Sequence, residues 1–237
     1  MSAVLWHDLE CGAYDVDLPL WRELAAATAG PVLDVGSGTG RVALDLARRG
    51  TPVVALDADA ELLAALAARA GTLPVSTACA DARTFELCER FALIIVPMQS
   101  VQLFGGPAGR AAFLRRARAH LAPDGLLALA ISAVLDPHAD GPAGEALPDL
   151  REIDGTLYSS RPVAIYGDGE SFVIERVREV VDPAGARRAS QDVIRLDRLD
   201  AATLQAEGKA AGLRVLPVRE IPETDEYVGS TVVMLGG

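Results

Sequence analysis

The sequence contains few cysteines, and their arrangement argues against two kinds of structural cross-link. Cys11, Cys79 and Cys88 are the only three cysteines among 237 residues. An odd number of thiols without metal-ligand spacing argues against a disulfide framework and against a zinc site. We therefore predict no metal site and expect all three thiols to be reduced packing residues.

Long apolar segments are also lacking. The longest apolar run without charge, residues 125–135, is shorter than the roughly 20 residues that a membrane-spanning helix requires. The first residues lack the basic and apolar regions of a signal peptide. These features predict no membrane partner and a cytoplasmic location.

Positive charge is scarce as well. Lys209 is the one lysine, and the 33 acidic side chains outnumber the 22 basic ones, which gives a formal net charge of −11. Such an excess repels a phosphate backbone, and the arginines form no basic stripe. Nucleic acid is therefore a poor candidate partner, and a small-molecule substrate is favoured.

The segment from Pro31 to Arg41, PVLDVGSGTGR, carries the strongest pattern in the chain. Its apolar residues predict a buried strand, and the three alternating glycines that begin at Gly36 let the backbone of a turn approach a ligand closely. A helix beginning near Thr39 would direct its unpaired amide groups at this turn. The pattern favours a negatively charged or carboxylate-bearing ligand there.

A second apolar strand, residues 52–56, ends in Asp57, twenty-one positions after Gly36. A carboxylate about 20 residues past the first glycine is where open α/β sheets bind a ribose diol. The ligand is therefore expected to contain an adenosine-type group. A dinucleotide fingerprint requires a small residue at the position of Arg41, so a nicotinamide cofactor is disfavoured.

These residues resemble motif I and the acidic second-strand tip of class I S-adenosylmethionine-dependent methyltransferases. Three further segments are similar to the same family: CADA at 79–82 resembles its adenine-contacting acid, FALIIVP at 91–97 its fourth strand, and HLAPDGLLALAIS at 120–132 its fifth. The fourth strand is not followed by the Asn-Pro-Pro-aromatic pattern of enzymes that methylate nucleic-acid bases. The resemblance therefore implies a member of the small-molecule type.

The expected fold class is α/β, a doubly wound, mostly parallel seven-stranded sheet (the Rossmann-like methyltransferase fold) with an antiparallel β insert after the fifth strand. Strands alternate with helical patterns at 61–69 and 108–121, which is typical of a parallel sheet. Three alternating runs, at 157–166, 172–181 and 189–196, are separated by hairpin signals at 167–169 and 182–185 and predict the antiparallel insert.

We expect a single methyltransferase domain over 1–237 with four parts. An N-terminal helical cap is expected at 1–30, with a helix over 18–27, and a cofactor-binding core at 31–134. A loop and antiparallel insert or lid would follow at 135–198, and a closing helix and strand pair at 199–237, with the strands at 213–218 and 228–235. A monomer and a homodimer are both compatible with the sequence.

The resemblance implies that the glycine turn holds the amino-acid end of S-adenosylmethionine, that Asp57 takes the ribose hydroxyls and that Asp81 takes the adenine amine. Other roles stay open: Asp57 or Asp59 caps the next helix, Asp81 is a turn carboxylate, and Asp34 is held by the amides of the turn. The expected cofactor-binding residues are Tyr14, Asp34, Gly36, Ser37, Gly38, Gly40, Asp57, Ala58, Asp81, Ala82, Pro97, Met98 and Gln99.

Candidate catalytic residues follow the fourth and fifth strands. The amides of Gln99 and Gln102 are placed to orient an acceptor, with ordinary hydrogen bonding inside the loop as the alternative. His138 follows the fifth strand and is the candidate general base, with a solvated loop histidine as the alternative. His120, near a helix C-terminus, suits a structural role. The acidic run 223–226 either attracts a cationic acceptor or forms a solvated turn.

The favoured hypothesis is transfer of the sulfonium methyl group to O, N or C of a small molecule by in-line displacement. The first alternative is an NAD(P)-dependent oxidoreductase. The second is a non-catalytic module that binds the cofactor without turning over an acceptor.

Overall fold

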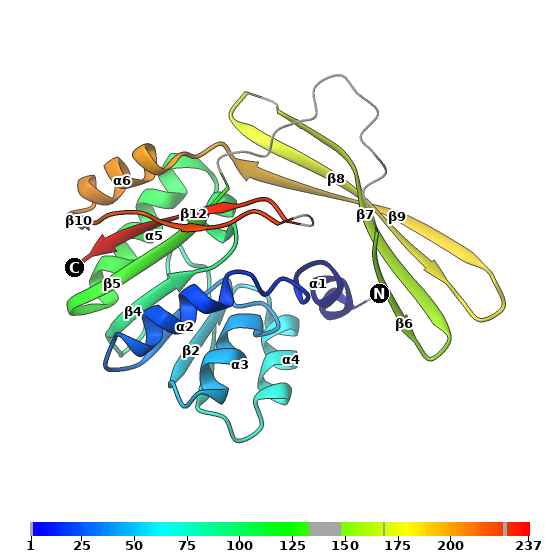
Figure 1. Ribbon diagram of the computed structural model, residues 1–237, viewed down its shortest axis with the longest axis horizontal. Coiled ribbons are helices and arrows are strands. Elements are labelled where there is room, and N and C mark those ends of the chain that lie inside the picture. The colour runs from blue at the N-terminus through cyan, green and yellow to red at the C-terminus, as the bar shows by residue number, and fades with distance from the viewer. Residues whose placement is uncertain (1, 133–147, 168, 225–226) are drawn as a thin grey trace. The chain divides into compact units, whose positions relative to one another are not determined.

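The computed structural model describes residues 2–132, 148–167, 169–224 and 227–237, and the chain divides into two compact units (Figure 1). We call Tyr14–Ala133 with Leu199–Gly237 the core unit. Met1–Ala13 with Val134–Arg198 form the insert unit. Among the helices of the described residues, none has the length and apolarity needed to span a lipid bilayer.

The core unit is built on a mixed sheet with strand order β3-β2-β1-β4-β5-β12-β10. The five strands from β3 to β5 pair in parallel, and β12 runs antiparallel to β5. The strands are β1 (Val32–Val35), β2 (Val53–Asp57), β3 (Val75–Cys79), β4 (Phe91–Val96), β5 (Leu121–Ile131), β10 (Arg214–Val215), β11 (Arg219–Ile221) and β12 (Ser230–Gly236).

This topology confirms the predicted fold class. Of the expected sixth strand, at 213–218, only Arg214–Val215 form a strand, β10, and the short strand β11 follows it; both pair with β12. The predicted closing strand at 228–235 corresponds to β12.

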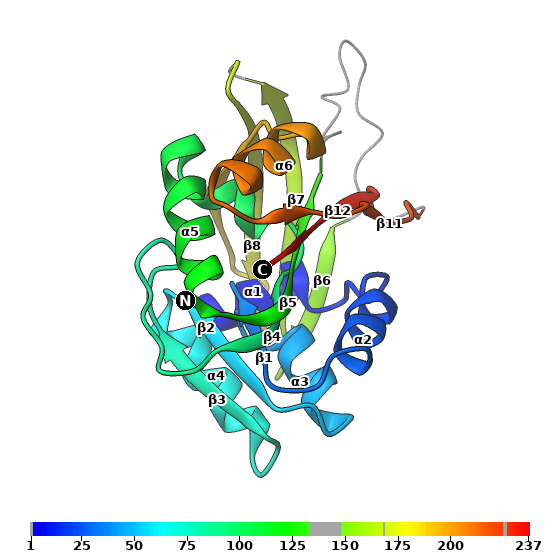
Figure 2. The same ribbon diagram turned by 90° about the vertical axis from the view of Figure 1, so that its left-hand side faces the viewer.

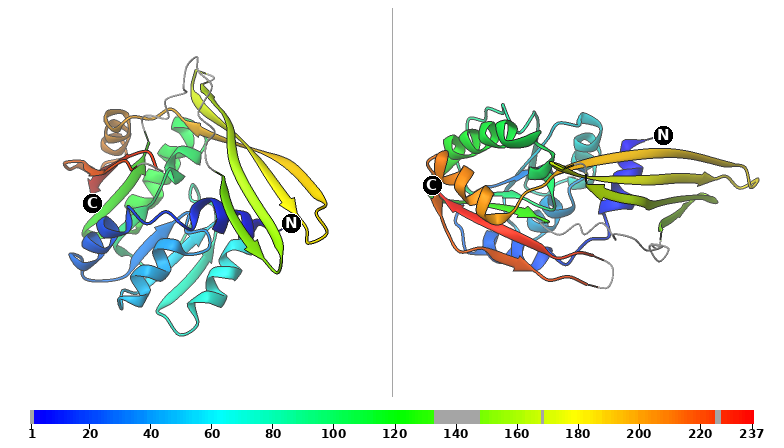
Figure 3. Two further views of the ribbon diagram at one scale, coloured as in Figure 1. Left: turned by 45° about the vertical axis from the view of Figure 1, so that its right-hand side comes forward. Right: turned by 90° about the horizontal axis from the view of Figure 1, so that it is seen from above.

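Helices cover both faces of the core sheet, as Figures 2 and 3 show for α2 and α5. Successive residues of a strand point to opposite faces, so Leu33 packs in the cluster beneath α5 and α6 while Val32 packs beneath α2, α3 and α4. The helices are α2 (Leu18–Ala26), α3 (Arg41–Arg48), α4 (Ala60–Ala70), α5 (Gly106–His120) and α6 (Ala201–Ala210), with the 3₁₀ turn η1 at Ser100–Leu103.

The insert unit is an antiparallel sheet of order β6-β7-β8-β9 (Figure 1). Its strands are β6 (Asp149–Ile153), β7 (Thr156–Gly167), β8 (Ser171–Val181) and β9 (Arg187–Asp197). The three predicted strands at 157–166, 172–181 and 189–196 are confirmed as β7, β8 and β9. Strand β6, which the turn Asp154-Gly155 joins to β7, is not predicted from the sequence.

The helix α1 (Ala3–Cys11) was not predicted from the sequence, and it belongs to the insert unit. Ser2 caps its N-terminus, and the apolar side chains Trp6 and Leu9 pack with Val180 of β8. The Glu10 carboxylate accepts hydrogen bonds from the Nε and Nη2 atoms of Arg178 at 2.7 and 2.8 Å. The nine-residue helix is therefore fixed by tertiary contacts, which a local sequence pattern does not reveal.

Candidate functional site

The carboxyl ends of the parallel strands bring most of the predicted site residues to one edge of the core sheet. Asp34 lies in β1 just before the glycine turn, Asp57 ends β2, and Pro97 follows β4. Cys79 ends β3 directly beside Asp57 in the strand register. Ligands of open α/β sheets bind at this edge, because the loops that follow the strands converge there.

The glycine turn adopts a backbone conformation that other residues rarely take. Gly36, Gly38 and Gly40 have φ angles of 73°, 54° and 95°. A Cβ atom at Gly36 would lie 2.7 Å from the Oγ atom of Ser100, which begins η1. The missing side chain therefore lets the turn pass close to the loop after β4, and the glycine pattern has a direct structural cause.

Asp57 joins the end of β2 to the glycine turn. Its Oδ2 atom accepts a hydrogen bond from the Gly38 amide at 2.8 Å, and its Oδ1 atom accepts one from the Asp59 amide at 2.9 Å. The helix-capping alternative belongs to Asp59, whose carboxylate accepts from the amides of Glu61 and Leu62 at the start of α4. Each carboxylate oxygen of Asp57 has a second lone pair, so it can still accept from a ligand diol.

Asp34 is a buried carboxyl group whose oxygens make no hydrogen bond of ordinary geometry among the described residues. Only 1% of its surface is exposed, and the charge of Arg41 and the backbone amide of Ala43, at the start of α3, offset its burial only in part. Burial raises the pKa of Asp34 to about 7. The Oγ atoms of Ser37 and Ser132, after β1 and β5, are likewise buried and unbonded within the described part of the chain. Buried polar atoms without partners are costly in a folded protein, so this edge is suited to a ligand that carries hydrogen-bond donors.

The raised pKa of Asp34 predicts a specific pH dependence of stability. The unfolded chain releases this proton near pH 4, whereas the folded chain holds it to about pH 7. Between these values the folded state binds more protons, so the contribution of Asp34 to stability falls as the pH rises. Thermal unfolding of Asp34→Asn and of the wild type should therefore show the variant gaining stability relative to the wild type from pH 5 to pH 8. If the stabilities of the two proteins changed with pH in the same way, Asp34 would not be a buried carboxyl group with a raised pKa.

A buried ion pair fixes the segment that precedes α2 to the start of α3. Asp17 is fully buried, and its carboxylate accepts two hydrogen bonds from Arg41 at 2.5 and 2.7 Å and one from the Trp21 indole at 2.8 Å. Arg41 also donates to the backbone oxygen of Tyr14 and lies over the Tyr14 ring, 5.1 Å from its centroid. Arg41 therefore connects Tyr14, an expected cofactor residue, with the helix that follows the glycine turn. The sequence reasoning missed Asp17.

The loop after β4 contains a residue in an uncommon conformation. Met98 has a φ angle of 54°, which is rare for a residue other than glycine and is found preferentially at functional sites. Gln99 follows it and precedes η1. The amide of Gln102 is buried and exchanges two hydrogen bonds with the backbone of Ser132, at 2.9 and 3.2 Å. Gln102 therefore joins this loop to the end of β5, which is the internal role that the sequence left open.

Asp81 is paired within its own turn. Its carboxylate accepts hydrogen bonds from the backbone amide and the guanidinium of Arg83, with the shortest contact at 2.5 Å. These hydrogen bonds hold the pKa of Asp81 at about 2, so the group stays ionised. Ala82, beside it, packs against the core cluster under α5. Ala58, after β2, accepts a weak hydrogen bond from the Cys79 thiol at 3.7 Å.

Of the three histidines, His7 lies in α1, His120 has a structural role, and His138 lies outside the described residues. His120 is buried, its Nε2 atom accepts from the Leu87 amide at 3.0 Å, and its Nδ1 atom lies 2.7 Å from the Arg116 carbonyl. This geometry assigns the proton to Nδ1 and supports the structural role. The candidate base His138 lies outside the described residues, as do two members of the acidic run, 225–226.

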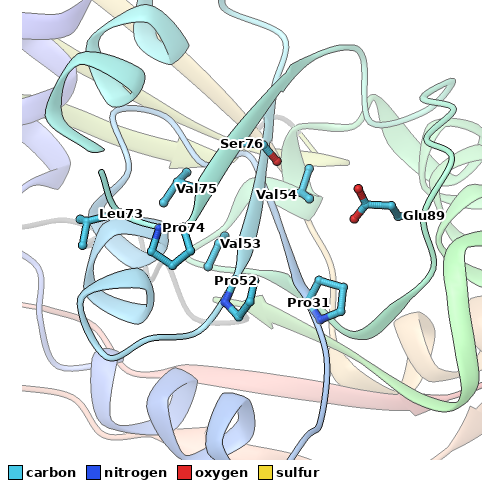
Figure 4. Close-up of a pocket in the computed structure, with 9 residues that line it drawn as sticks. All are labelled: Pro31, Pro52, Val53, Val54, Leu73, Pro74, Val75, Ser76 and Glu89. Carbon is cyan, nitrogen blue, oxygen red and sulfur yellow. The ribbon is translucent and has the colours of Figure 1, made fainter. Parts of the chain in front are cut away.

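A shallow hollow of about 350 Å³ lies at the opposite edge of the sheet, at the amino ends of β1, β2 and β3 (Figure 4). Pro31, Pro52 and Pro74, which precede these strands, line it together with Glu89. None of the predicted site residues contributes to it. Within the described residues, no cluster of His, Cys, Asp or Glu is arranged to hold a metal ion.

Comparison with known proteins shows which family model and which solved structures this chain resembles. Residues 32–125 match the family model of a methyltransferase domain. No protein with a curated description matches the chain. Among solved structures, the S-adenosylmethionine-bound amino pentose methyltransferase CalS10 from Micromonospora echinaspora shares 24% identity over 99% of this chain and 97% of its own, with a TM-score of 0.74.

Two further structures are similar over nearly the whole chain. An S-adenosylmethionine-dependent methyltransferase from Clostridium acetobutylicum is 14% identical over 99% of this chain and 96% of its own, with a TM-score of 0.74. The sugar N-methyltransferase KedS8 from a Streptoalloteichus species is 20% identical over 97% of this chain and 90% of its own, with a TM-score of 0.71. At these identities the likeness establishes a shared fold.

Proposed function

We propose that this chain, which carries a methyltransferase domain over residues 32–125, transfers the methyl group of S-adenosylmethionine to a small-molecule acceptor. The observation that carries the proposal is the glycine turn with its two carboxylates. Gly36 is exposed in this turn, Asp57 is hydrogen-bonded to the Gly38 amide, and the buried carboxyl of Asp34 makes no hydrogen bond of ordinary geometry within the described residues.

The residues present fit the proposed cofactor. The ammonium group of its amino-acid end matches the buried carboxyl of Asp34, and the ribose diol matches the remaining lone pairs of Asp57. The cofactor's carboxylate is not assigned to the amides of Gly36, Ser37, Gly38 and Gly40, which already donate within the chain. Asp81 and its neighbour Ala82 are assigned to the adenine, Tyr14 to the cofactor's outer side, and Met98 to the wall beside the methyl group.

The proposed reaction requires no covalent intermediate with a residue of the protein. The sulfonium supplies a methyl group that is already activated for displacement. The residues at the sheet edge hold and orient the two reactants in line and exclude water. We assign the orientation of the acceptor to Gln99 and the removal of its proton, where one must leave, to His138.

The acceptor atom that we favour is an amine nitrogen. Two of the proteins with this fold act on an amino pentose or on a sugar nitrogen, as their names state. The formal charge of −11 also favours approach of a cationic amine over that of an anionic acceptor. A decisive assay pairs amino sugars with the same sugars carrying a hydroxyl in place of the amine. We expect a methyl gain, measured by mass spectrometry, in the amines alone.

Two outcomes of this assay would contradict the proposal. Methylation of the hydroxyl members alone would reject the amine assignment but keep the methyltransferase. Binding of the cofactor product S-adenosylhomocysteine with no turnover of any compound in a broad panel would favour the non-catalytic alternative.

Cys79 and Cys88 are exposed, so the packing role expected of them from the sequence is wrong. The thiol of Cys79 can therefore report on binding of the cofactor. Cys79 lies beside Asp57 in the strand register, whereas Cys88, also exposed, lies three residues before the amino end of β4 at the other edge of the sheet. S-adenosylhomocysteine should slow the alkylation of Cys79 by iodoacetamide and leave the rate at Cys88 unchanged. Peptide mass spectrometry measures both rates in one sample. Equal protection at the two thiols, or none at either, would argue against this placement.

A further inference from the structure

Asp34 lies in the middle of the core sheet and has apolar neighbours in both adjacent strands. The register places it between Ala55 of β2 and Ile95 of β4, and both of these residues are fully buried. Asp34 itself is 1% exposed, and its carboxyl group makes no hydrogen bond of ordinary geometry within the described residues. Water therefore has almost no access to this group, so a negative charge on it must be stabilised by the protein or by a ligand.

The charged groups that face Asp34 come from three other parts of the core unit. Arg41 is the first residue of α3, Asp57 is the last residue of β2, and Asp17 precedes α2. All three act on the charge of the Asp34 carboxyl group, and the backbone amide of Ala43 in α3 adds a favourable dipole. One cation and two anions thus surround this group before it ionises.

The arginine of this cluster is paired with another carboxylate. Arg41 donates two hydrogen bonds to the fully buried Asp17, at 2.5 and 2.7 Å. Such a bidentate pair fixes the direction of the guanidinium and offsets most of its charge. Asp57 contributes a further negative charge. The ionised form of Asp34 is therefore disfavoured by its surroundings as well as by its burial, which raises the pKa of Asp34 to about 7.

The proposed cofactor carries the positive charge that would stabilise ionised Asp34. Its amino-acid end has an ammonium group, which is a donor of hydrogen bonds and has no acceptor of its own. An ionised carboxylate offers only acceptors, whereas a protonated carboxyl group turns one oxygen into a donor. Charge-assisted hydrogen bonds are also about twice as strong as neutral ones. The ammonium group therefore binds ionised Asp34 more tightly than protonated Asp34.

We propose that binding of the cofactor's ammonium group is coupled to the release of one proton from Asp34. The O–H bond of the Asp34 carboxyl group breaks, the proton passes to the solvent, and the electron pair stays on the carboxylate that faces the ammonium. This inference rests on the proposed function, because it places the amino-acid end of the cofactor at Asp34. It makes the proton a competitor of the cofactor at this site.

The coupling gives the affinity a defined dependence on pH. Below the pKa of free Asp34, about 7, the cofactor must displace the proton, so each further pH unit weakens the apparent affinity about tenfold. Lowering the pH from 7.5 to 5 should therefore raise the dissociation constant of S-adenosylhomocysteine by roughly fifty- to a hundredfold. Above pH 7.5 the constant should change little, because Asp34 is then already ionised.

The test is titration calorimetry of the intact protein with S-adenosylhomocysteine across this pH range. At pH 6 the titration is repeated in buffers of different ionisation enthalpy, and the dependence of the heat on the buffer gives the number of protons released, with about one expected. The matched ligand is 5′-methylthioadenosine, which has the adenosyl thioether but no amino-acid end. It should release no proton and bind equally well at every pH.

Two variants separate Asp34 from the other carboxylates. Asp34→Asn keeps the shape of the side chain and removes the titrating group, so it should bind S-adenosylhomocysteine more weakly at pH 7.5, with no further loss at pH 5 and no proton release. Asp45→Asn is the matched control. Asp45 also lies in this part of the fold, in α3, but it pairs with Arg22, so its loss should leave the wild-type pH profile intact.

The outcomes distinguish this inference from the proposed function. Binding of S-adenosylhomocysteine with a constant affinity and no proton release would overturn the inference alone. Equal proton release with 5′-methylthioadenosine, or an unchanged pH profile in Asp34→Asn, would also overturn it. No binding of S-adenosylhomocysteine at any pH would overturn the proposed function and this inference together. The proton count is made on the wild type, so it decides the question even if Asp34→Asn does not fold.

Discussion

Replacing Asp57 with alanine is expected to weaken the binding of S-adenosylhomocysteine by about ten- to a hundredfold. The carboxylate is the charged acceptor assigned to the ribose diol, and charge-assisted hydrogen bonds contribute roughly 1.5–3 kcal/mol. The same change removes the bond to the Gly38 amide, so the glycine turn also loses its fixed position. Titration calorimetry of the wild type and the variant measures the effect.

Asp59→Ala is the matched control for this prediction. Asp59 lies two residues away and caps α4, so its loss should lower stability by about 1 kcal/mol and leave the affinity for the thioether unchanged. If Asp57→Ala bound the thioether as tightly as the wild type, or if Asp59→Ala weakened binding equally, the carboxylate of Asp57 would not be the ribose ligand.

Gly36→Ala is expected to have a still larger effect, with a loss of affinity above roughly a hundredfold. The new methyl group would stand 2.7 Å from the Ser100 Oγ atom, so the turn or the loop after β4 must move. The residue would also be held at a φ of 73°, which costs an alanine about 1–2 kcal/mol. Both effects disturb the backbone that approaches the cofactor.

Gly50→Ala separates the two contributions. Gly50 has a φ of 87°, but a Cβ atom there would meet nothing within 4 Å. Both variants should therefore melt at lower temperatures than the wild type, and only Gly36→Ala should lose binding in the calorimeter. Ser100→Gly, combined with Gly36→Ala, removes the contacting side chain and should restore part of the affinity. Unchanged affinity in Gly36→Ala alone would show that the ligand does not approach this turn.

The sequence predicts those parts of the site that depend on short stretches of consecutive residues. Alternating glycines, a carboxylate about 20 residues later and regular strand spacing are each visible in a few consecutive residues, and they gave the parallel sheet, the glycine turn and the placement of Asp57. The match of residues 32–125 to a methyltransferase domain confirms the family resemblance seen in those motifs.

The parts that the sequence does not predict depend on contacts between distant residues. In the sequence, Arg41 is only evidence against a dinucleotide cofactor. In the structure, it pairs with Asp17, 24 positions earlier, and with the Tyr14 backbone. The pairing of Glu10 with Arg178 spans 168 positions and fixes α1. Such pairs leave no periodic signal, because each partner reads locally as an ordinary charged residue.

Asp34 shows a third situation. The sequence places a carboxylate before the glycines, but it does not show whether the amides of the turn satisfy it. Within the described residues neither oxygen makes a hydrogen bond of ordinary geometry, which favours a ligand-binding role over a structural one. That distinction requires the backbone geometry of the turn itself.

A crystal structure of the protein with S-adenosylhomocysteine tests the central claim most directly. The account predicts the ribose hydroxyls on Asp57, the amino group on Asp34 and the thioether chain along the turn at Gly36. Density for the ligand at another place, such as the hollow beside Glu89, or an empty glycine turn in crystals saturated with the compound, would contradict it.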